Sequence, residues 1–366
     1  MSKRLKLGII GGGQLALMAL PTLHRYQIDT FILADSEDPC AQVDARCYIG
    51  SPTNYQDVLS FGKKCTHITV EIENVNIEAL EELEHLGIDV CPRTEVLKLI
   101  RDKKKQKDFF IKENFPCAPF AKEKYFPVIQ KLCVGGYDGK GVRLQESAVA
   151  LAKKSLPGEC FLEEKINIKK ELSIIVARNR AGEMTQLPVV EMVFNKKLNL
   201  LDYLFSPADI SALTLNKMQQ IAADIANKIK LEGILAIEFF ETIEGEIMIN
   251  EIAPRPHNSG HHTLEANSLS QFELWIRAVL NWPLPQSITK SPAFCANILG
   301  QNKTGETLIR GFENLLLEPS ISLHLYHKKI SHPGRKMGHV TILKADRESA
   351  LKDLKRIRSC LVIEGS

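Results

Sequence analysis

The chain gathers its chemically active side chains most densely between Ile249 and His262, in the run INEIAPRPHNSGHH. A carboxylate, an arginine, asparagine and three histidines stand here among prolines and a glycine, and a second carboxylate, Glu238, precedes the run. A buried core strand seldom carries so many polar groups, because burying them without partners is costly. The pattern therefore predicts a site where a metal ion and anions meet.

Glu238 and Glu251 are expected to lie opposite each other on a β-hairpin. The run AIEFFETIEGEIMINEI indicates two apolar strands around a turn, and a turn centred on Glu244 and Gly245 pairs the two glutamates. Directly opposed side chains lie about 5 Å apart, where like charges repel unless a cation lies between them. Magnesium suits this place because it takes one or two carboxylates together with phosphate oxygens. We predict a metal site for Mg²⁺, with Mn²⁺ as an alternative ion; a solvated hairpin edge is the other explanation of the pair taken alone.

A second candidate site is the glycine-rich run GGYDGKG at residues 135–141. Glycine leaves backbone amides free to approach phosphate oxygens closely, and Lys140 adds a positive charge. Such a loop can also close as a lid that excludes water. The run lacks the GxxxxGK[ST] pattern of a Walker-type loop, and a surface turn is the alternative explanation.

A third pattern lies near the N-terminus. Gly11-x-Gly13-x-x-Ala16 follows an apolar segment, and Asp35 lies 22 residues past Gly13. This spacing imitates the dinucleotide fingerprint and, taken alone, favours a nicotinamide-dependent dehydrogenase. That function leaves the two hairpin glutamates and the RPHNSGH run without a role. The same turn also serves any other anion at a helix N-terminus.

The elements that position these residues alternate between strand and helix at the start of the chain. We expect strands over 5–10, 30–34, 67–70 and 88–91 and helices over 14–26 and 77–86. This order predicts a doubly wound, Rossmann-like unit. Farther on we expect a basic helical stretch over 94–114, mixed β segments over 160–191, a long helix over 216–229, a proline-rich linker over 282–292 and a small β-rich unit from residue 293.

Composition and charge exclude several classes of protein. With 366 residues the chain is long enough for two or three domains, and 44% hydrophobic with 25% charged residues is typical of globular proteins. A net charge of +3 gives no reason to expect nucleic acid or a membrane as partner, and no apolar run approaches the roughly 20 residues of a membrane-spanning helix. Nine cysteines without a CxxC pair indicate reduced thiols in a cytoplasmic protein, and neither a disulfide framework nor a zinc site.

Seven segments, in family order, resemble the ATP-grasp family and, within it, the 5-(carboxyamino)imidazole ribonucleotide synthases, which are ATP-dependent carboxylases of purine biosynthesis. They are GIIGGGQLALM at 8–18, TVEIENV at 69–75, GGYDGKG at 135–141, the stretch 163–173, NEIAPRPHNSGHH at 250–262, SQFELWIRAVLNWPLPQ at 270–286 and HPGRKMGHV at 332–340. The resemblance implies an α/β ATP-grasp fold with a Rossmann-like pre-ATP-grasp domain (1–95), an ATP-grasp domain for nucleotide and metal (96–292) and a small β-rich C-terminal domain (293–366) that helps to bind the substrate phosphate. In that family the first domain binds no nicotinamide and forms one wall of the ribonucleotide pocket.

The resemblance also implies roles for individual residues. On the ATP side it implies contacts from Lys107, Lys131, Gly135, Gly136, Gly139, Lys140, Gly141, Glu163, Ile166 and Glu171, with Glu163 and Ile166 holding adenine through their backbone and Glu171 holding the ribose. On the acceptor side it implies Gln14, Glu73, Tyr137, Asp138, Arg255, His257, Asn258, Lys328, Arg335 and Lys336, the last three at the 5′-phosphate. Catalytic roles are implied for Lys131, Asp138, Arg255 and His257, and metal binding for Glu238 and Glu251. We expect Lys103 to Lys105 on a solvated helix face, and leave open whether His261 and His262 are structural.

The reaction that the resemblance implies is carboxylation of the exocyclic amine of 5-aminoimidazole ribonucleotide, with ATP and bicarbonate as co-substrates. It proceeds through carboxyphosphate and yields 5-carboxyaminoimidazole ribonucleotide, ADP and phosphate on the route to IMP. Glu73 and Asp138 are the candidates to guide the amine proton. Another ATP-grasp ligase, using formate or another acid on a different amine, is the alternative within the family. The resemblance further implies a homodimer and a hand-off of the product to the mutase of the next step.

One region departs from the family pattern. Between Pro116 and Lys131 the chain is shorter than the family's segment by roughly one helix, about 11–12 residues. Leu132 and Cys133 stand where basic residues are frequent, and Met192 replaces a more usual polar residue. We therefore expect the small subdomain that covers the nucleotide to be trimmed or differently connected, which affects ATP affinity more than the type of reaction.

Overall fold

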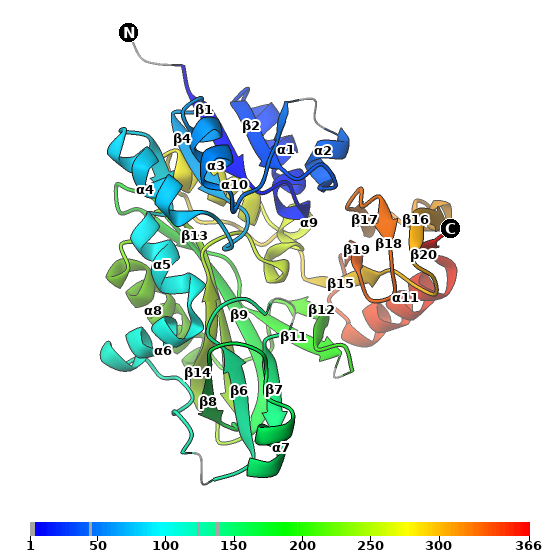
Figure 1. Cartoon of the computed structure of the whole chain (residues 1–366). Helices are drawn as coiled ribbons and strands as arrows, with labels where there is room; N and C mark the ends of the chain where they lie inside the picture. Colours follow the sequence, from blue (N-terminus) through cyan, green and yellow to red (C-terminus); the bar gives the residue numbers. More distant parts are fainter. Residues whose placement is uncertain (1–3, 44–45, 123–124, 137–138, 196) are drawn as a thin grey trace.

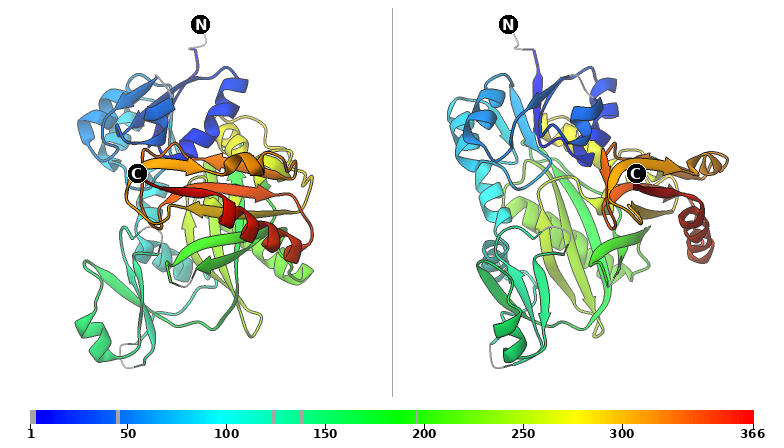
Figure 2. Two further views of the ribbon diagram at one scale, coloured as in Figure 1. Left: turned by 90° about the vertical axis from the view of Figure 1, so that its right-hand side faces the viewer. Right: turned by 45° about the vertical axis from the view of Figure 1, so that its right-hand side comes forward.

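The structure, a computed structural model, describes residues 4–43, 46–122, 125–136, 139–195 and 197–366. Figure 1 shows an N-terminal unit at the top, a large sheet below it, a small sheet at the bottom and the C-terminal strands at the right. The right-hand view of Figure 2 shows the small sheet at the lower left and the C-terminal strands at the right.

The N-terminal unit is a five-stranded parallel sheet in the order β3-β2-β1-β4-β5. The two core clusters that hold its buried side chains show α1 and α2 packed on one face and α3 and α4 on the other. Each of the six elements predicted here ends within one residue of its expected bounds, so the Rossmann-like prediction is confirmed. The strands are β1 (Lys6–Ile10), β2 (Asp29–Ala34), β3 (Cys47–Ile49), β4 (His67–Val70) and β5 (Asp89–Cys91), and the helices are α1 (Gln14–Arg25), α2 (Pro39–Val43), α3 (Tyr55–Gly62) and α4 (Ile77–His85).

The basic stretch expected as one helix over 94–114 divides into α5 (Thr94–Arg101) and α6 (Lys103–Lys112). Asp102 has an extended backbone between them, and its carboxylate accepts hydrogen bonds from the amides of Lys104 and Lys105 at 2.9 and 3.1 Å. Such an N-cap starts a new helix. The chain then enters the small antiparallel sheet β7-β6-β8, and no helix lies between α6 and β6 in the residues that the structure describes there. Its elements are β6 (Val128–Leu132), β7 (Val142–Gln145), α7 (Ala148–Lys153) and β8 (Cys160–Glu164).

The large sheet has nine strands in the order β14-β13-β9-β11-β12-β15-β19-β17, with β10 paired to β9. Helix α8 (Ala212–Lys228) packs on one face of its central strands and α10 (Gln271–Val279) on the other. Helix α8 starts four residues before the predicted 216, because the hydroxyl of Ser211 caps the amide of Thr214 at 3.0 Å. The strands are β9 (Ile168–Arg178), β10 (Met184–Gln186), β11 (Val190–Asn195), β12 (Leu200–Ser206), β13 (Gly233–Thr242), β14 (Ile247–Ala253), β15 (Ala293–Leu299), β17 (Ile321–Leu325) and β19 (Lys336–Ile342).

The C-terminal region is β-rich as expected, but only some of its strands form a separate sheet, and the others belong to the large sheet. Strand β15 pairs with β12, so the large sheet runs without a break across residue 293. A separate sheet of β16 (Gly305–Arg310), β18 (Ile330–Ser331) and β20 (Val362–Gly365) lies beside it, with α11 (Arg347–Cys360). Short helices η1 (Asn258–Gly260), α9 (Thr263–Ala266) and η2 (Phe312–Leu315) complete the region. In the ranges given above, no helix is both long and apolar enough to cross a membrane.

Candidate active site

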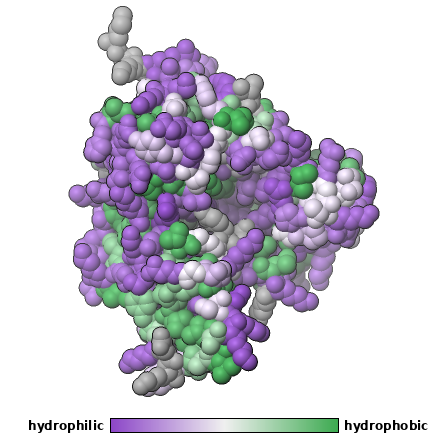
Figure 3. Space-filling model, in the orientation of Figure 1, coloured by the Kyte–Doolittle hydropathy of each residue, from purple (hydrophilic) through white to green (hydrophobic). Residues whose placement is uncertain are grey.

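A cavity of about 520 Å³ lies between the small sheet, the central strands and the segment that follows β4. Figure 3 shows the surface hollowed near its centre, below the N-terminal unit, on a face that is mostly hydrophilic. The structure thus brings residues from distant segments to one place. The predicted site residues that line this cavity are Glu73, Lys131, Gly135, Gly136, Gly139, Glu163, Ile166, Glu171, Glu238, Glu251, Arg255, His257, Asn258 and Lys336.

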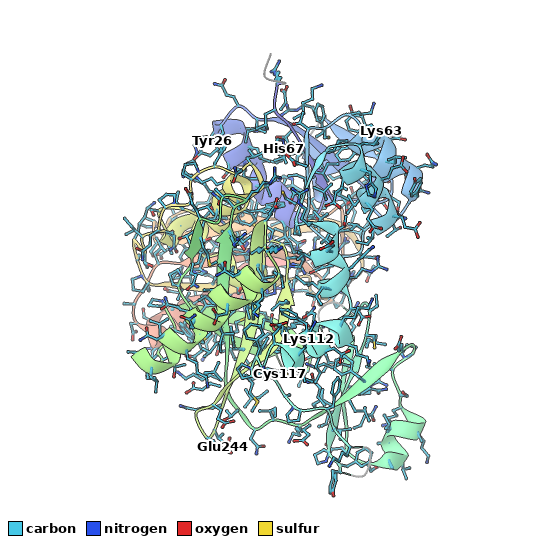
Figure 4. The ribbon with its side chains drawn as sticks, turned by 90° about the vertical axis from the view of Figure 1, so that its left-hand side faces the viewer. Tyr26, Lys63, His67, Lys112, Cys117 and Glu244 are labelled. Atoms are coloured by element: carbon cyan, nitrogen blue, oxygen red, sulfur yellow. The ribbon has the colours of Figure 1, made fainter. Side chains whose placement is uncertain are left out.

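The hairpin of β13 and β14 places the two glutamates as predicted, because Glu238 pairs with Glu251. The register shifts by one residue between Glu238 and Phe239, which makes Asn250 the extra residue of a β-bulge. Glu241 pairs with Ile247, which centres the turn on Glu244 and not between Glu244 and Gly245 as predicted, so without this bulge Asn250 would lie opposite Glu238. Figure 4 shows Glu244 at the tip of the hairpin, at the opposite end of the molecule from the N-terminal unit.

The two carboxylates have different electrostatic surroundings. Burial raises the pKa of Glu238, and the charges of Glu251 and Glu171 raise it further. Burial acts in the same direction on Glu251, but the positive charges of Lys103 and Lys131 outweigh it, so the pKa of Glu251 lies below its ordinary value. The raised pKa of Glu238 shows that a second negative charge at this position is unfavourable without a counter-charge, which a bound cation would supply.

The donor set at this position fits a hard divalent cation. Asn250 donates its side-chain amide to Glu238 Oε2 at 3.2 Å, and its Oδ1 accepts from Lys131 Nζ at 3.0 Å. No group of three or more His, Cys, Asp or Glu side chains is arranged to hold a metal ion in the described ranges. Two carboxylates completed by phosphate oxygens and water suit Mg²⁺, whereas a structural zinc site needs four protein ligands.

Glu163 on β8 joins two buried lysines near the glutamate pair Glu238 and Glu251. Lys107 Nζ lies 2.7 Å from its Oε1 and Lys131 Nζ 2.8 Å from its Oε2, and the three side chains are 4 to 9% exposed. Lys107 also donates to the carbonyl of Ala118 and does not line the cavity, whereas Lys131 does. The contact of Lys107 with phosphate stays a prediction. In this structure the partner of Lys107 is the carboxylate of Glu163.

Lys103 corrects the expectation of a solvated face over residues 103–105. Its ammonium contacts the carboxylate of Glu251 and it lines the cavity, while Lys104 and Lys105 are exposed. Burial lowers the pKa of Lys103, but Glu251, with smaller effects from other carboxylates, raises it overall. The break at Asp102 sets the first residue of α6 beside β14, and a run of four basic residues in five does not reveal which of them turns inward.

Arg255, His257 and Asn258 follow β14 and connect the glutamate pair to two other parts of the molecule. Arg255 Nε lies 2.7 Å from Glu73 Oε1, on the segment after β4. His257 Nε2 lies 3.3 Å from Glu238 Oε1, and Asn258 Nδ2 donates to Asn297 Oδ1 on β15 at 3.0 Å. The three residues that were predicted together thus stand at one end of the cavity.

The glycine-rich loop and Glu171 face the same cavity. Gly135, Gly136 and Gly139 have φ values of 81°, 77° and 72°, a conformation that favours glycine. Glu171 on β9 is largely buried, which raises its pKa to about 7. The predicted residues Tyr137 and Asp138 lie outside the described residues.

The dinucleotide-like turn has its anion position filled by the chain itself. The carboxylate of Glu71 accepts hydrogen bonds from the amides of Gly13, Leu15 and Ala16 at the start of α1. The nicotinamide alternative is therefore wrong, because a pyrophosphate would need these same amides. The amides of Gly13, Leu15 and Ala16 are therefore already bonded and not open to the substrate phosphate, whereas the contact of Gln14 itself stays a prediction.

The remaining predicted residues lie away from the cavity wall. Lys328 Nζ donates to the carbonyl of Lys336 at 2.8 Å, so it stands beside a residue that does line the cavity. His261 and His262 are buried, with 1% exposure each, and do not line the cavity, which favours the structural interpretation of both. The predicted site residues that do not line the cavity are Gln14, Lys107, Lys140, Gly141, Lys328 and Arg335.

Three family models match the chain in succession. The ribonucleotide synthetase preATP-grasp domain matches residues 4–101, the ATP-grasp domain residues 109–272, and the phosphoribosylaminoimidazole carboxylase C-terminal domain residues 293–353. The N5-carboxyaminoimidazole ribonucleotide synthase of Bacillus subtilis (strain 168) is 32% identical over 364 residues, which cover 95% of this chain and 94% of that protein. The chain spans 63 to 66% of the length of the phosphoribosylaminoimidazole carboxylases that it also matches.

Solved structures resemble the whole fold. The N5-carboxyaminoimidazole ribonucleotide synthetase of Thermotoga maritima is 34% identical, with a TM-score of 0.88 over 99% of this chain and 100% of that chain. The N5-carboxyaminoimidazole synthase of Aspergillus clavatus, in complex with ADP and 5-aminoimidazole ribonucleotide, is 27% identical, with a TM-score of 0.86 over 98% of this chain and 99% of that chain.

Proposed function

We propose a function from one premise: the chain belongs to the N5-carboxyaminoimidazole ribonucleotide synthase family. The proposed reaction joins a carboxyl group from bicarbonate to the exocyclic amine of 5-aminoimidazole ribonucleotide, while ATP becomes ADP and phosphate. The observation that carries the proposal is the opposed pair Glu238 and Glu251 on a cavity that also holds the glycine-rich loop and Arg255. The Aspergillus clavatus relative binds ADP and the same ribonucleotide, which supports both substrates.

The phosphoryl-transfer end of the cavity is proposed around the hairpin. Glu238 and Glu251 would hold Mg²⁺, which neutralises charge on a phosphoryl group during its transfer. Lys103 and Lys131 line the same cavity, and they would supply two further positive charges to phosphates bound there. The carboxylate of Glu171 accepts hydrogen bonds from the ribose hydroxyls. The backbone around Ile166, between β8 and β9, forms hydrogen bonds with the adenine edge.

The acceptor end is proposed around Arg255. Its planar guanidinium matches two oxygens of bicarbonate or carboxyphosphate, and Glu73 forms an ion pair with its Nε. His257 and Asn258 border the ribonucleotide. The 5′-phosphate is held by Lys336, which lines the cavity, together with Lys328 and Arg335 on the same part of the C-terminal region.

The chemistry follows from the weakness of bicarbonate as an electrophile. A bicarbonate oxygen attacks the γ-phosphorus, the bond to the β-phosphate oxygen breaks, and carboxyphosphate forms. The amine then bonds to its carbon, or to the carbon dioxide that it releases, while phosphate leaves. The amine proton passes to Glu73 or Asp138. Closure of the glycine-rich loop excludes water, which would otherwise hydrolyse the intermediate.

An ADP-release assay with one substrate omitted at a time tests the proposal. We expect release to need both bicarbonate and 5-aminoimidazole ribonucleotide. Release that formate supports in place of bicarbonate, or that another amine supports equally well, would favour the alternative ATP-grasp ligase. Release that proceeds without any amine at the full rate would contradict carboxylation.

We propose further that the protein works in the cytoplasm as a homodimer, with domains over 1–95, 96–292 and 293–366, and passes its product to a mutase. Family membership supports the dimer and the hand-off, and nine free cysteines support a reducing compartment. Light scattering of the purified protein tests the dimer, which a monomeric mass at working concentration would exclude.

A further inference from the structure

Glu71 is a buried carboxylate that the proposed reaction does not use. It directly follows β4, its backbone amide donates to the carbonyl of Ile10 at 3.0 Å, and the residue is 3% exposed. Its Oε2 accepts from the amides of Leu15 and Ala16, each at 3.1 Å, and its Oε1 from the amide of Gly13. These are the first amides of α1, which have no partner within the helix.

The glycines of the dinucleotide-like turn make room for this carboxylate. A Cβ atom on Gly11 would lie 2.6 Å from Glu71 Cγ, and one on Gly13 would lie 2.4 Å from Glu71 Oε1. In a nucleotide-binding turn of this kind the same glycines let the backbone approach a pyrophosphate. Here the chain's own side chain occupies that space, so the motif is used for an internal anion.

Charge explains why a buried acid is tolerated at this position. Burial, with a smaller effect from Asp38, raises the pKa of Glu71 above its ordinary value, and the amides of Ala16 and Gly13 and the charge of Arg255 offset this rise only in part. The N-terminus of a helix carries roughly half a positive charge, which favours the ionised carboxylate. Glu71 and Glu73 both act on Arg255, since each carboxylate raises the pKa of the guanidinium.

We propose that Glu71 is a positioning residue that serves as an internal anion. It fills the anion site of α1, which keeps phosphate groups of substrates away from this turn. It also fixes the segment from which Glu73 meets Arg255 in the cavity. The first part stands on the contacts of Glu71 alone, and the second part rests on the proposed function.

Two substitutions separate these parts. Glu71→Ala leaves three amides without a partner beside an empty volume of carboxylate size, so inorganic phosphate is expected to bind there. Glu71→Gln keeps the volume filled and leaves no such space, but it removes the negative charge and turns a donor toward the amides. A matched control is Glu273→Gln. Glu273, on α10, is also a buried acid; it accepts hydrogen bonds from Tyr26 and Arg277 and does not line the cavity.

The decisive measurement is the melting temperature during a titration with inorganic phosphate. All proteins carry Lys328→Ala, Arg335→Ala and Lys336→Ala, so that the proposed site for the 5′-phosphate does not contribute. We expect a saturable rise for Glu71→Ala and no rise for the parent, Glu71→Gln or Glu273→Gln. A parent that responds as strongly as Glu71→Ala, or a folded Glu71→Ala that does not respond, would overturn the internal-anion assignment. This readout needs no turnover, so it is independent of the proposed reaction.

Steady-state kinetics of Glu71→Gln, with the proposed site for the 5′-phosphate intact, test the positioning role even if Glu71→Ala does not fold. We expect the KM for the ribonucleotide to rise about five-fold or more while the KM for ATP is unchanged, since Arg255 and Glu73 lie at the acceptor end. A merely structural role would lower the fraction of active protein and kcat without moving either KM. That result, or an equal rise of both KM values, would contradict the positioning role.

Discussion

Replacing Glu163 with glutamine tests the charge arrangement near the glutamate pair Glu238 and Glu251. The carboxylate has ion pairs with Lys107 at 2.7 Å and Lys131 at 2.8 Å, and all three side chains are nearly excluded from water. Glutamine keeps the shape but leaves two buried ammonium groups without a counter-charge. Removing one partner of a buried pair typically costs about 3–5 kcal/mol, because the remaining charge is uncompensated.

We therefore expect Glu163→Gln to destabilise the region around β6 and β8 by about 3 kcal/mol, roughly a hundred-fold in the local opening equilibrium. Native-state hydrogen exchange of the β6 and β8 amides measures this directly. Combining Glu163→Gln with Lys131→Met removes one of the stranded charges, so the double variant is expected to regain part of the loss.

The matched control is an exposed ion pair. Asp29→Asn breaks the pair with Arg4, whose side chains are 26% and 79% exposed, and is expected to cost less than about 1 kcal/mol. A loss for Glu163→Gln no larger than that of Asp29→Asn would refute the reasoning. The double variant would also refute it if Lys131→Met lowered the free energy of unfolding as much in the Glu163→Gln protein as it does in the parent.

Three further outcomes are expected. Glu251→Ala should abolish ADP release at saturating Mg²⁺ and leave the circular dichroism spectrum unchanged, and turnover at the wild-type rate would exclude the metal role. Arg335→Ala should raise the KM for the ribonucleotide at least ten-fold more than the KM for ATP, as expected for loss of a charged phosphate contact worth about 1.4 kcal/mol or more; equal effects would count against a phosphate ligand. Burial raises the pKa of Glu171 from 4.5 to about 7, so the folded protein binds this proton more tightly than the unfolded chain. This stabilisation is present below pH 4.5 and is lost as the pH rises through 7. Glu171→Gln should therefore make the free energy of unfolding depend less on pH between 5 and 8. A urea midpoint that varies with pH in the variant as it does in the parent would contradict this prediction.

The parts of the fold with strong local patterns were predictable from the sequence. The alternation at the start of the chain gave the Rossmann-like unit, because buried parallel strands read as short apolar runs between helices. The pairing of Glu238 with Glu251 was also right, although the sequence does not show the bulge at Asn250 that produces it. The continuity of the sheet from β12 into β15 was not predictable, since strand pairing over 90 residues leaves no local pattern.

The site was predictable where residue types are unusual and not where ordinary charged residues turn inward. Arg255, His257 and Asn258 stood out by composition and line the cavity. The sequence predicts a solvated position for Lys103, because only the break at Asp102 orients it toward Glu251. Glu71 was missed altogether, since the glycines of the nearby turn suggested a bound ligand and not a side chain from 58 residues farther along.

A crystal of the protein grown with ADP and Mn²⁺ tests the central claim most directly, since the anomalous signal of manganese locates the ion. The account predicts a peak between the carboxylates that face each other on the β13–β14 hairpin, in contact with the diphosphate. A peak at any other position, with those two carboxylates still paired only to protein groups, would contradict it.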